Sequence, residues 1–262
     1  MDESEYLHMY EEEERHWWYV GMRAIVLSLL RSVSLPAGTR VLDAGCGTGY
    51  NLGWFRRHFG ADVTGIDYFR QGLDFCRRRG ERSLVRGDAA SLPFSGEAFD
   101  LVVSFDVLTH LKDEHARAAA LGEFLRVLRP GGYLLVRVAA YECLRSSHDT
   151  AIMTRHRYGK NELRDAVAAA GFQPERLTSA NTILFPAAAL WRILKKAGLA
   201  PAGSDVGPTT RGSDLINRTM TSILGLEAAM LRSGSFNLAF GLSIFLLACK
   251  PRPQKRTTKT YT

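Results

Sequence analysis

The stretch "VLDAGCGTGYN", residues 41–51, joins an apolar run to three glycines at alternate positions. An apolar run that ends in a glycine-rich turn before a helical pattern is typical of the first strand, turn and helix of a nucleotide-binding α/β fold. Gly45, Gly47 and Gly49 permit positive φ angles and let the backbone approach a ligand closely. The turn therefore predicts a site for a nucleotide-like ligand at the end of a buried strand.

Outward from this turn, the chain alternates strand patterns with helix patterns. The expected strands are 40–45, 62–67, 83–89, 99–107, 133–139, 172–182 and 241–250. The expected helices are 50–60, 68–80, 113–129 and 161–171, with a turn at 130–132 and a mostly helical insertion at 183–235. This order predicts a doubly wound α/β fold, in which helices cover both faces of a mostly parallel sheet and strand 241–250 pairs inside it.

The composition indicates one sizeable core and a reducing environment. The chain has 262 residues, 46% of them hydrophobic, and its four cysteines lie far apart without a CxxC pair. Thiols are therefore expected rather than disulfides or a metal site. The acidic start lacks the pattern of a secretory signal, and the longest apolar stretch, 236–249, is short for a bilayer. We expect a cytoplasmic protein without a transmembrane segment.

Charge is spread unevenly along the chain. The net charge is +7, yet the first fourteen residues hold seven acids and no Lys or Arg. Residues 251–262 form a basic, polar tail that we expect to be disordered. The basic remainder is compatible with an anionic substrate, with peripheral contact to a membrane surface, or with nucleic acid. A solvated basic surface is the simpler explanation, because basic groups are normally exposed.

Two side chains help to decide which ligand the glycine turn receives. The turn alone fits NAD, FAD or S-adenosylmethionine. Tyr50 stands where the dinucleotide fingerprint has a third small residue, and its bulk hinders close packing of helix on strand. Asp43 would repel a pyrophosphate, whereas S-adenosylmethionine presents an ammonium group. Both observations favour S-adenosylmethionine.

Further acids follow the next two expected strands. Asp67 ends the second strand, where a carboxylate can accept hydrogen bonds from both hydroxyls of a ribose. A helix N-cap is the alternative role for this residue. Asp88 and Ala89 end the third strand, where an acceptor and a main-chain N–H can bind the edge of an adenine.

Five motifs in order resemble those of the class I S-adenosylmethionine-dependent methyltransferases. They are "VLDAGCGTGYN", "GIDY" (65–68), "GDAASLPF" (87–94), "FDLVVSFDVLTHL" (99–111) and "RVLRPGGYLLV" (126–136). The resemblance covers about residues 38–140 and implies a Rossmann-like, seven-stranded sheet with an antiparallel last strand. It also implies S-adenosylmethionine as the cofactor. The implied cofactor-binding residues are Trp18, Arg23, Asp43, Gly45, Cys46, Gly47, Gly49, Asp67, Tyr68, Asp88, Ala89, Ser104 and Phe105.

The flanks resemble one bacterial subgroup of these enzymes. Its members begin with an acidic helix that runs into His-Trp-Trp-Phe and an arginine, as "ERHWWYVGMR" (14–23) does here with Tyr19 for the phenylalanine. The resemblance implies an N-terminal helical lid, 1–36, on a methyltransferase domain, 37–250, with Arg23 reaching the methionine carboxylate. An amphipathic helix that buries its tryptophans on the sheet is the alternative. Arg145 replaces a tryptophan of the subgroup, and Ala139 a common proline.

Methyl transfer depends chiefly on alignment of the reacting atoms, so a general base is optional. The candidate catalytic residues are His110, His148, His156 and Tyr158. A carboxylate fixes the tautomer of a neighbouring imidazole, which makes Asp149 a candidate partner for His148. Arg155, Arg157 and Tyr158 can clamp an anionic acceptor, or they can belong to a solvated loop. We expect no metal.

We expect the chain to methylate a small molecule, apolar or anionic, such as a natural product, a lipid or a saccharide precursor. One alternative is a methyltransferase-like protein that binds the cofactor and only regulates. Another is a nucleic-acid methyltransferase, which ranks lower because the chain lacks an Asn-Pro-Pro-Tyr base pocket and an RNA-binding module. A nicotinamide dehydrogenase ranks last because of Tyr50 and Asp43.

Overall fold

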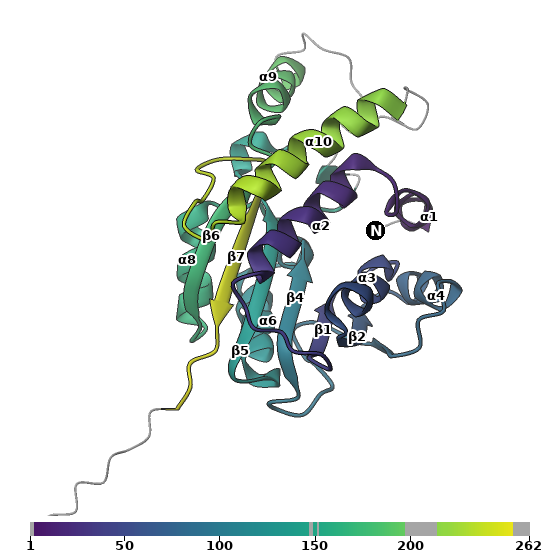
Figure 1. Ribbon diagram of the computed structural model, residues 1–262, viewed down its shortest axis with the longest axis vertical. Coiled ribbons are helices and arrows are strands. Elements are labelled where there is room, and N and C mark those ends of the chain that lie inside the picture. Colours follow the sequence, from purple (N-terminus) through teal and green to yellow (C-terminus); the bar gives the residue numbers. More distant parts are fainter. Residues whose placement is uncertain (1–2, 147–148, 151, 197–213, 254–262) are drawn as a thin grey trace, which may run out of the picture.

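A single seven-stranded sheet forms the centre of the computed structural model, which describes residues 3–146, 149–150, 152–196 and 214–253. The strands follow the order β3-β2-β1-β4-β5-β7-β6 (Figure 1). Strand β7 runs antiparallel to both of its neighbours, and the other neighbouring pairs are parallel. The strands are β1 (Arg40–Ala44), β2 (Asp62–Asp67), β3 (Leu84–Arg86), β4 (Phe99–Phe105), β5 (Leu128–Ala139), β6 (Gln173–Ala180) and β7 (Ser243–Cys249). The predicted fold class and the inner position of the last strand are confirmed.

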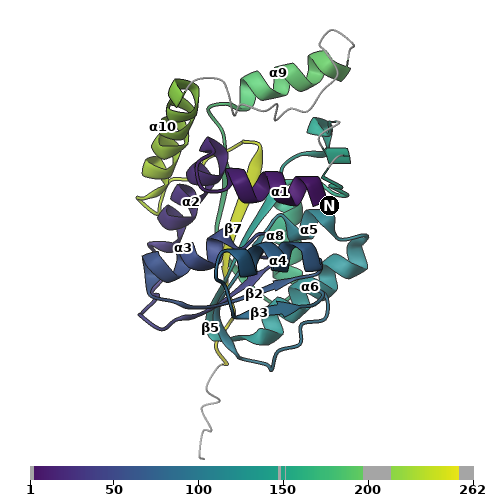
Figure 2. The same cartoon turned by 90° about the vertical axis from the view of Figure 1, so that its right-hand side faces the viewer.

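Helices cover both faces of this sheet. One core lies under α2, α3, α4 and α10, and the other lies under α5, α6 and α8 (Figure 1). Helices α1 and α9 lie at the end where the parallel strands finish, as Figure 2 shows. The helices are α1 (Glu3–Glu12), α2 (Trp17–Leu30), α3 (Tyr50–Phe59), α4 (Arg70–Arg78), α5 (Val107–His110), α6 (Glu114–Val127), α8 (Lys160–Ala169), α9 (Phe185–Lys196) and α10 (Asp214–Leu231), with a 3₁₀ turn η1 (Glu142–Leu144).

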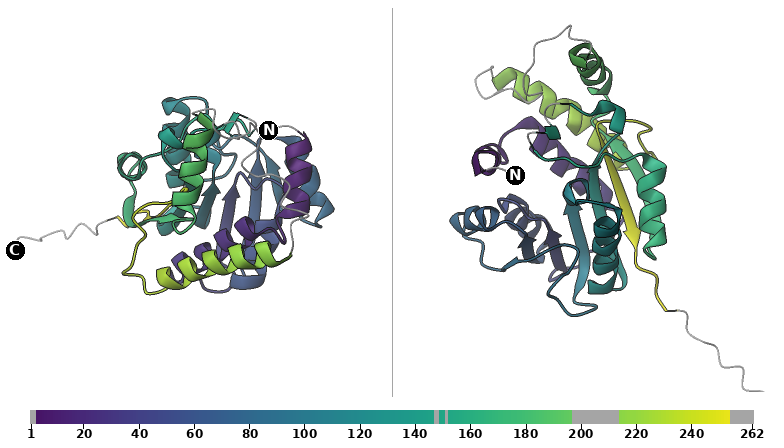
Figure 3. Two further views of the ribbon diagram at one scale, coloured as in Figure 1. Left: turned by 90° about the horizontal axis from the view of Figure 1, so that it is seen from above. Right: turned by 180° about the vertical axis from the view of Figure 1, so that it is seen from behind.

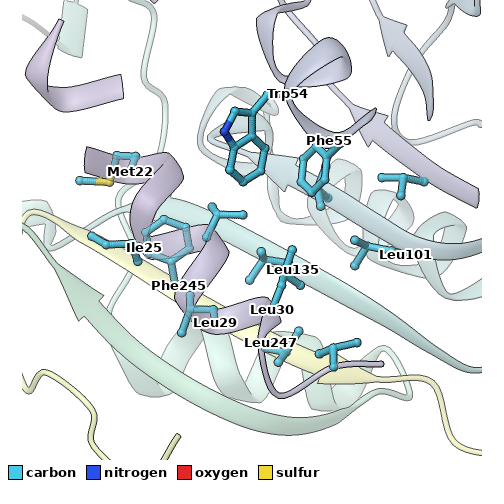
Figure 4. Packing of buried hydrophobic residues seen from close by; sticks show 14 of the residues in the cluster. Met22, Ile25, Leu29, Leu30, Trp54, Phe55, Leu101, Leu135, Phe245 and Leu247 are labelled. Atoms are coloured by element: carbon cyan, nitrogen blue, oxygen red, sulfur yellow. The ribbon is translucent and has the colours of Figure 1, made fainter. Parts of the chain in front are cut away.

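Helix α2 forms part of the hydrophobic core. Its Met22, Ile25 and Leu29 are buried in the same cluster as Phe245 and Leu247 of β7 (Figure 4). Helix α10 packs along α2 at close range. The contact leaves no room for a side chain at Gly21, where a Cβ atom would lie 2.3 Å from the side chain of Leu224. Helix α10, late in the sequence, therefore holds the N-terminal helix α2 against the sheet.

One local expectation was wrong. Residues 130–132 were predicted as a turn before the fifth strand, but they lie within β5. The reason is a partner distant in sequence: Gly131 N donates to Lys250 O at 2.8 Å, and Lys250 N donates to Gly132 O at 2.8 Å. These bonds extend the ladder between β5 and β7. Residues 197–213 of the predicted insertion and 254–262 of the predicted tail lie outside the described residues.

The order of the strands places a ligand site at one edge of the sheet. The chain winds from β1 through β2 to β3 on one side, and then continues from β4 to β5 on the other. Ligands of such sheets bind outside the carboxyl ends of the strands at this switch point. Seen from above in Figure 3, left, these strand ends lie in view between α1, α9 and α10. Among the described residues, no helix is both long and apolar enough to cross a membrane.

Candidate functional site

The glycine turn after β1 is fixed by backbone conformation and by packing. Gly45, Gly47 and Gly49 have φ angles of 91°, 55° and 85°, which glycine adopts without strain. A Cβ atom on Gly45 would lie 2.0 Å from Val107 of α5, and one on Gly49 would lie 2.7 Å from Cys76 of α4. The glycines therefore let two helices close around the turn, in addition to any room that they leave for a ligand.

Asp43 is a buried carboxylate at the end of β1. Its exposed fraction is 1%, and its Oδ2 atom has no hydrogen-bond partner. Burial, helped by the nearby carboxylates of Glu13 and Asp67, raises the pKa of Asp43 to about 8. A buried carboxylate oxygen without a hydrogen-bond partner in the protein is costly, and a cation placed beside it would relieve the cost. The observation points to a ligand with a positive group.

Asp67 lies next to the turn at the end of β2. Its Oδ2 accepts a hydrogen bond from Gly47 N at 2.9 Å, and its Oδ1 accepts one from Phe69 N at 2.9 Å. The hydroxyl of Tyr6 donates to Oδ1 at 3.5 Å. These bonds hold the carboxylate rigidly, and a carboxylate has lone pairs for further donors. Asp67 is not the N-cap of α4, which is Phe69, and its bond from Phe69 N closes a local turn instead. Ribose binding by Asp67 stays a prediction.

Residues 42–136 match the family model described as "Methyltransferase domain". This range includes Asp43, the glycine turn and Asp67. Residues 42–136 therefore form a methyltransferase domain of the S-adenosylmethionine-dependent type.

Curated relatives agree on the chemistry and differ in substrate. The chain is 38% identical over 122 residues to the tRNA (carboxymethyluridine(34)-5-O)-methyltransferase of Arabidopsis thaliana, across 47% of this chain and 28% of that one. It is 34% identical over 166 residues to a protein of Mycolicibacterium smegmatis named probable S-adenosylmethionine-dependent methyltransferase, across 62% of each. The fatty-acid O-methyltransferase of the same organism is 42% identical over 102 residues, 37% of this chain and 36% of that one. The matches span less than two thirds of each relative.

The fold recurs in solved structures. Phosphoethanolamine N-methyltransferase 2 of Haemonchus contortus, in complex with phosphomonomethylethanolamine and S-adenosylhomocysteine, superimposes with a TM-score of 0.56. The two chains are 19% identical, and the match covers 87% of this chain and 52% of that one. The cofactor of the family suits the charges found here, because its ammonium group would meet the unpaired oxygen of Asp43.

The predicted residues of the N-terminal segment lie near this site. The Arg137 guanidinium lies 4.6 Å from the centre of a Trp18 ring, and the same guanidinium binds Asp106 at the end of β4. Arg23 donates from Nη2 to the main-chain oxygen of Glu13 at 2.7 Å. The predicted contacts of Trp18 and Arg23 with the cofactor remain predictions.

The remaining predicted cofactor residues follow the carboxyl ends of the strands. Asp88 and Ala89 follow β3 after one intervening residue, and Asp88 Oδ1 accepts a hydrogen bond from Ala90 N at 2.9 Å. Ser104 is buried at the end of β4 with an unpartnered hydroxyl, beside the half-buried Phe105. Tyr68 is largely exposed. Cys46 is buried in the turn with a free thiol 3.9 Å from that of Cys76.

The candidate catalytic histidines differ in environment. His110 is half-buried at the end of α5, and its Nδ1 lies 3.2 Å from Met153 O. His156 lies 2.5 Å from the Glu162 carboxylate through its Nε2 atom. His148 lies outside the described residues. In the described part of the chain, no cluster of His, Cys, Asp or Glu has the arrangement of a metal site.

Two of the other candidate groups are buried. Burial raises the pKa of Tyr158, so the phenol stays protonated at neutral pH and is a poor base. Arg157 donates from Nε to Asp149 Oδ1 at 2.8 Å and from Nη1 to Ala140 O at 2.8 Å. The buried Arg157–Asp149 pair therefore serves the fold. Arg157 is buried, which does not suit the expected role as a clamp for an anionic acceptor. The expected pairing of Asp149 with His148, which lies outside the described residues, stays a prediction.

Glu13, the residue that follows α1, makes contacts that the sequence analysis missed. Glu13 is buried, accepts a hydrogen bond from the Thr48 hydroxyl and lies 3.4 Å from Arg79 Nη2. Burial raises the pKa of Glu13, while the bond from Thr48 and the charge of Arg79 oppose that shift. Arg79 also donates from Nε to Thr48 O at 3.1 Å. These contacts tie α1 to the glycine turn.

A signal for this helix was present in the sequence. Tyr6, Met9, Tyr10 and Glu13 follow one another at positions i, i+3, i+4 and i+7, which puts them on one helix face. The acidic run around Glu13 concealed the pattern, because Glu is normally exposed.

Proposed function

We propose that this chain transfers the methyl group of S-adenosylmethionine to a small acceptor with an apolar body. The observation that carries the proposal is the unpaired, buried Oδ2 of Asp43 beside the glycine turn. A cationic cofactor explains it, and a dinucleotide with two anionic phosphates does not. The position of the turn at the switch point of the sheet supports the same assignment.

Each acid near the turn then has a task in binding. Asp43 receives the ammonium end, Asp67 accepts from the ribose hydroxyls, and Asp88 with Ala89 receives the adenine edge. When bound, the cofactor supplies an electrophilic methyl group. The chain itself contributes orientation and the exclusion of water, since α1 packs over the turn, where Met9 lies against Gly47.

His110 is the best placed of the candidate bases that lie within the described residues. It lies near enough to Asp67 for the Asp67 carboxyl to feel its charge. Tyr158 is held protonated by burial, and His156 is engaged by Glu162. We therefore propose that His110 takes up the proton of a hydroxyl or amine acceptor.

An apolar acceptor is supported by the surroundings of the strand ends. Helix α9 lies there with exposed apolar side chains, among them Leu190 and Trp191. One relative is named a fatty-acid O-methyltransferase. A tRNA acceptor is the second candidate, because another relative bears a tRNA methyltransferase name and this chain has a net charge of +7.

Two measurements test the proposal. Calorimetry with S-adenosylhomocysteine should show binding, and NAD should show none. Production of S-adenosylhomocysteine should then be measured with three classes of acceptor. These are fatty acids, apolar alcohols and amines, and tRNA. Turnover on tRNA alone would replace the apolar acceptor by the second candidate. Binding without turnover on any acceptor would support a regulatory protein, and absence of binding would overturn the whole assignment.

A further inference from the structure

Asp106 has a main-chain conformation that few residues other than glycine adopt. It follows β4 directly, and its φ and ψ angles of 62° and 1° lie in the left-handed region. Aspartate is one of the side chains that occur there, and such a conformation persists only where the surroundings fix it. The bend starts α5 at the carboxyl end of β4, the edge of the sheet that also carries the glycine turn. A strained residue at this edge indicates a role in the site.

Arg137 of β5 fixes the bend through both its main chain and its side chain. Its main-chain oxygen accepts a hydrogen bond from Asp106 N at 2.8 Å. Its guanidinium donates to Asp106 Oδ2 from Nε at 3.0 Å and from Nη2 at 2.5 Å. The Arg137 side chain is 11% exposed, so little water competes with this ion pair. Two donors on one rigid plane therefore fix the position of the carboxylate as well as balance its charge.

The same guanidinium contacts two aromatic rings. The Arg137 Cζ atom lies 4.6 Å from the centre of a Trp18 ring and 5.2 Å from the centre of the Phe105 ring. A guanidinium over a ring face is attracted to it, and more strongly where water is excluded. Trp18 lies in the first turn of α2, whereas Phe105 is the last residue of β4. Arg137 therefore joins the N-terminal segment to the strand end from which α5 starts.

Helix α5 connects this bend to the cofactor turn and to the candidate base. The main-chain N and the hydroxyl of Thr109 both donate to Asp106 O, so the bend sets the course of the helix. Val107 packs on the glycine turn so closely that a Cβ atom on Gly45 would lie 2.0 Å from it. His110 ends the same helix. A shift of Asp106 would therefore move Val107 and His110 together.

We infer that Arg137 is a positioning residue of the methyl-transfer site. By holding Asp106 in its bend it sets α5, and by its contact with Trp18 it makes that setting depend on the N-terminal segment. The contacts belong to the chain itself, whereas their effect on turnover rests on the proposed function. Since methyl transfer depends on the alignment of the reacting groups, a displacement of α5 lowers the rate.

Four variants of the full chain test the inference. Arg137→Met removes the guanidinium but keeps a long side chain against Trp18, and Arg137→Lys restores a charge without the planar fork. Asp106→Gly adopts the bend without strain and loses the ion pair. Arg129→Met is the matched control, because Arg129 and Asp100 form an ion pair at 2.8 Å that also links β5 with β4, at the opposite end of β4.

Hydrogen–deuterium exchange of the free protein needs no acceptor and reports on the positions of both segments. In the two variants that lack the ion pair, we expect amides of residues 107–111 and 18–22 to exchange about tenfold faster or more, because both segments lose a contact that holds them. Exchange should be partly restored in Arg137→Lys and unchanged in Arg129→Met. Exchange in α3 and α8 should stay unchanged in every variant, which separates local loosening from global unfolding. Should Arg137→Met fail to fold, Asp106→Gly and Arg137→Lys provide the same comparison.

Turnover with an acceptor that the wild type methylates connects the ion pair to the reaction. We expect kcat to fall about tenfold or more in Arg137→Met and Asp106→Gly, while KM for the acceptor changes less than about threefold. Arg137→Lys should recover part of the rate, and Arg129→Met should match the wild type.

Different results would overturn the inference and the proposed function. If Asp106→Gly matches the wild type in exchange and in kcat, the bend alone suffices and Arg137 positions nothing. If Arg137→Met binds S-adenosylhomocysteine more weakly without faster exchange in α5, the arginine contacts the ligand directly, which also overturns the inference. A wild type that neither binds S-adenosylhomocysteine nor methylates an acceptor would overturn the proposed function, and the exchange measurement would still decide whether Arg137 sets α5.

Discussion

Replacement of Asp67 by asparagine tests the cofactor site at its most constrained side chain. The carboxylate accepts main-chain bonds from Gly47 and Phe69, both at 2.9 Å, and a weaker one from the Tyr6 hydroxyl. Asparagine keeps the shape but turns one oxygen into a donor. One of the two main-chain N–H groups then faces another donor, at a cost in folding stability of about 1–3 kcal/mol. Relief of the buried charge, which raises the pKa of Asp67, offsets part of this cost.

The effect on cofactor binding is separate and larger. Hydrogen bonds to a charged group contribute about 1.5–3 kcal/mol each, and a ribose offers two hydroxyls. Asparagine can retain one neutral bond, so we expect a loss of about 2–4 kcal/mol. This corresponds to a dissociation constant about 30 to 1000 times higher.

Isothermal titration calorimetry with S-adenosylhomocysteine measures this change, and thermal unfolding measures the stability term independently. Asp74→Asn is the matched control, since Asp74 forms exposed ion pairs with Arg70 and Arg77 on α4 and such pairs contribute little. A folded Asp67→Asn variant that binds the ligand as tightly as Asp74→Asn does would refute the assignment of Asp67 to the ribose.

Other predictions concern the turn, the buried acid and the buried ion pair. Gly49→Ala should destabilise the fold by about 2 kcal/mol or more in thermal unfolding, because alanine is strained at a φ of 85° and its methyl group would meet α4. The control Gly122→Ala should not destabilise the fold, because a Cβ atom at Gly122 would have nothing within 4 Å. Since the pKa of Asp43 is raised from its ordinary value of 3.8 to about 8 in the folded state, its contribution to stability is fully present below about pH 3.8 and is lost as the pH rises through 8. Asp43→Asn should remove that part of the pH dependence in urea titrations, and affinity for the cationic cofactor should rise toward pH 8 in the wild type only. Asp149→Ala should lower stability by about 3–5 kcal/mol, because it leaves the buried Arg157 unpaired; an unchanged melting temperature would contradict that account.

Much of the fold could be predicted from local patterns. The alternation of apolar strands with amphipathic helices gave the element order, and the turn from Gly45 to Gly49 gave the position of the site. Asp43 and Asp67 were found because each lies at the end of a strand, a position that follows from the sequence alone. These features depend on neighbours within a few residues, where periodicity and turn chemistry are informative.

Contacts across the chain were decided only by the tertiary structure. Glu13 belongs to an acidic run whose composition predicts exposure to solvent. In the structure it is buried, because the Thr48 hydroxyl donates to its carboxylate and Arg79 forms an ion pair with it. The local sequence of residues 130–132 predicts a turn, but their main-chain hydrogen bonds with Lys250 make them part of β5.

By itself the sequence determined the fold class, the ligand turn and the acids that face it, because each is a local pattern of side-chain type and spacing. The packing of α10 on α2, the closure of α1 over the turn and the pairing of Arg157 with Asp149 were decided by the tertiary structure. An amphipathic pattern shows that a helix has a face to bury, but which surface meets that face depends on the whole arrangement of the chain.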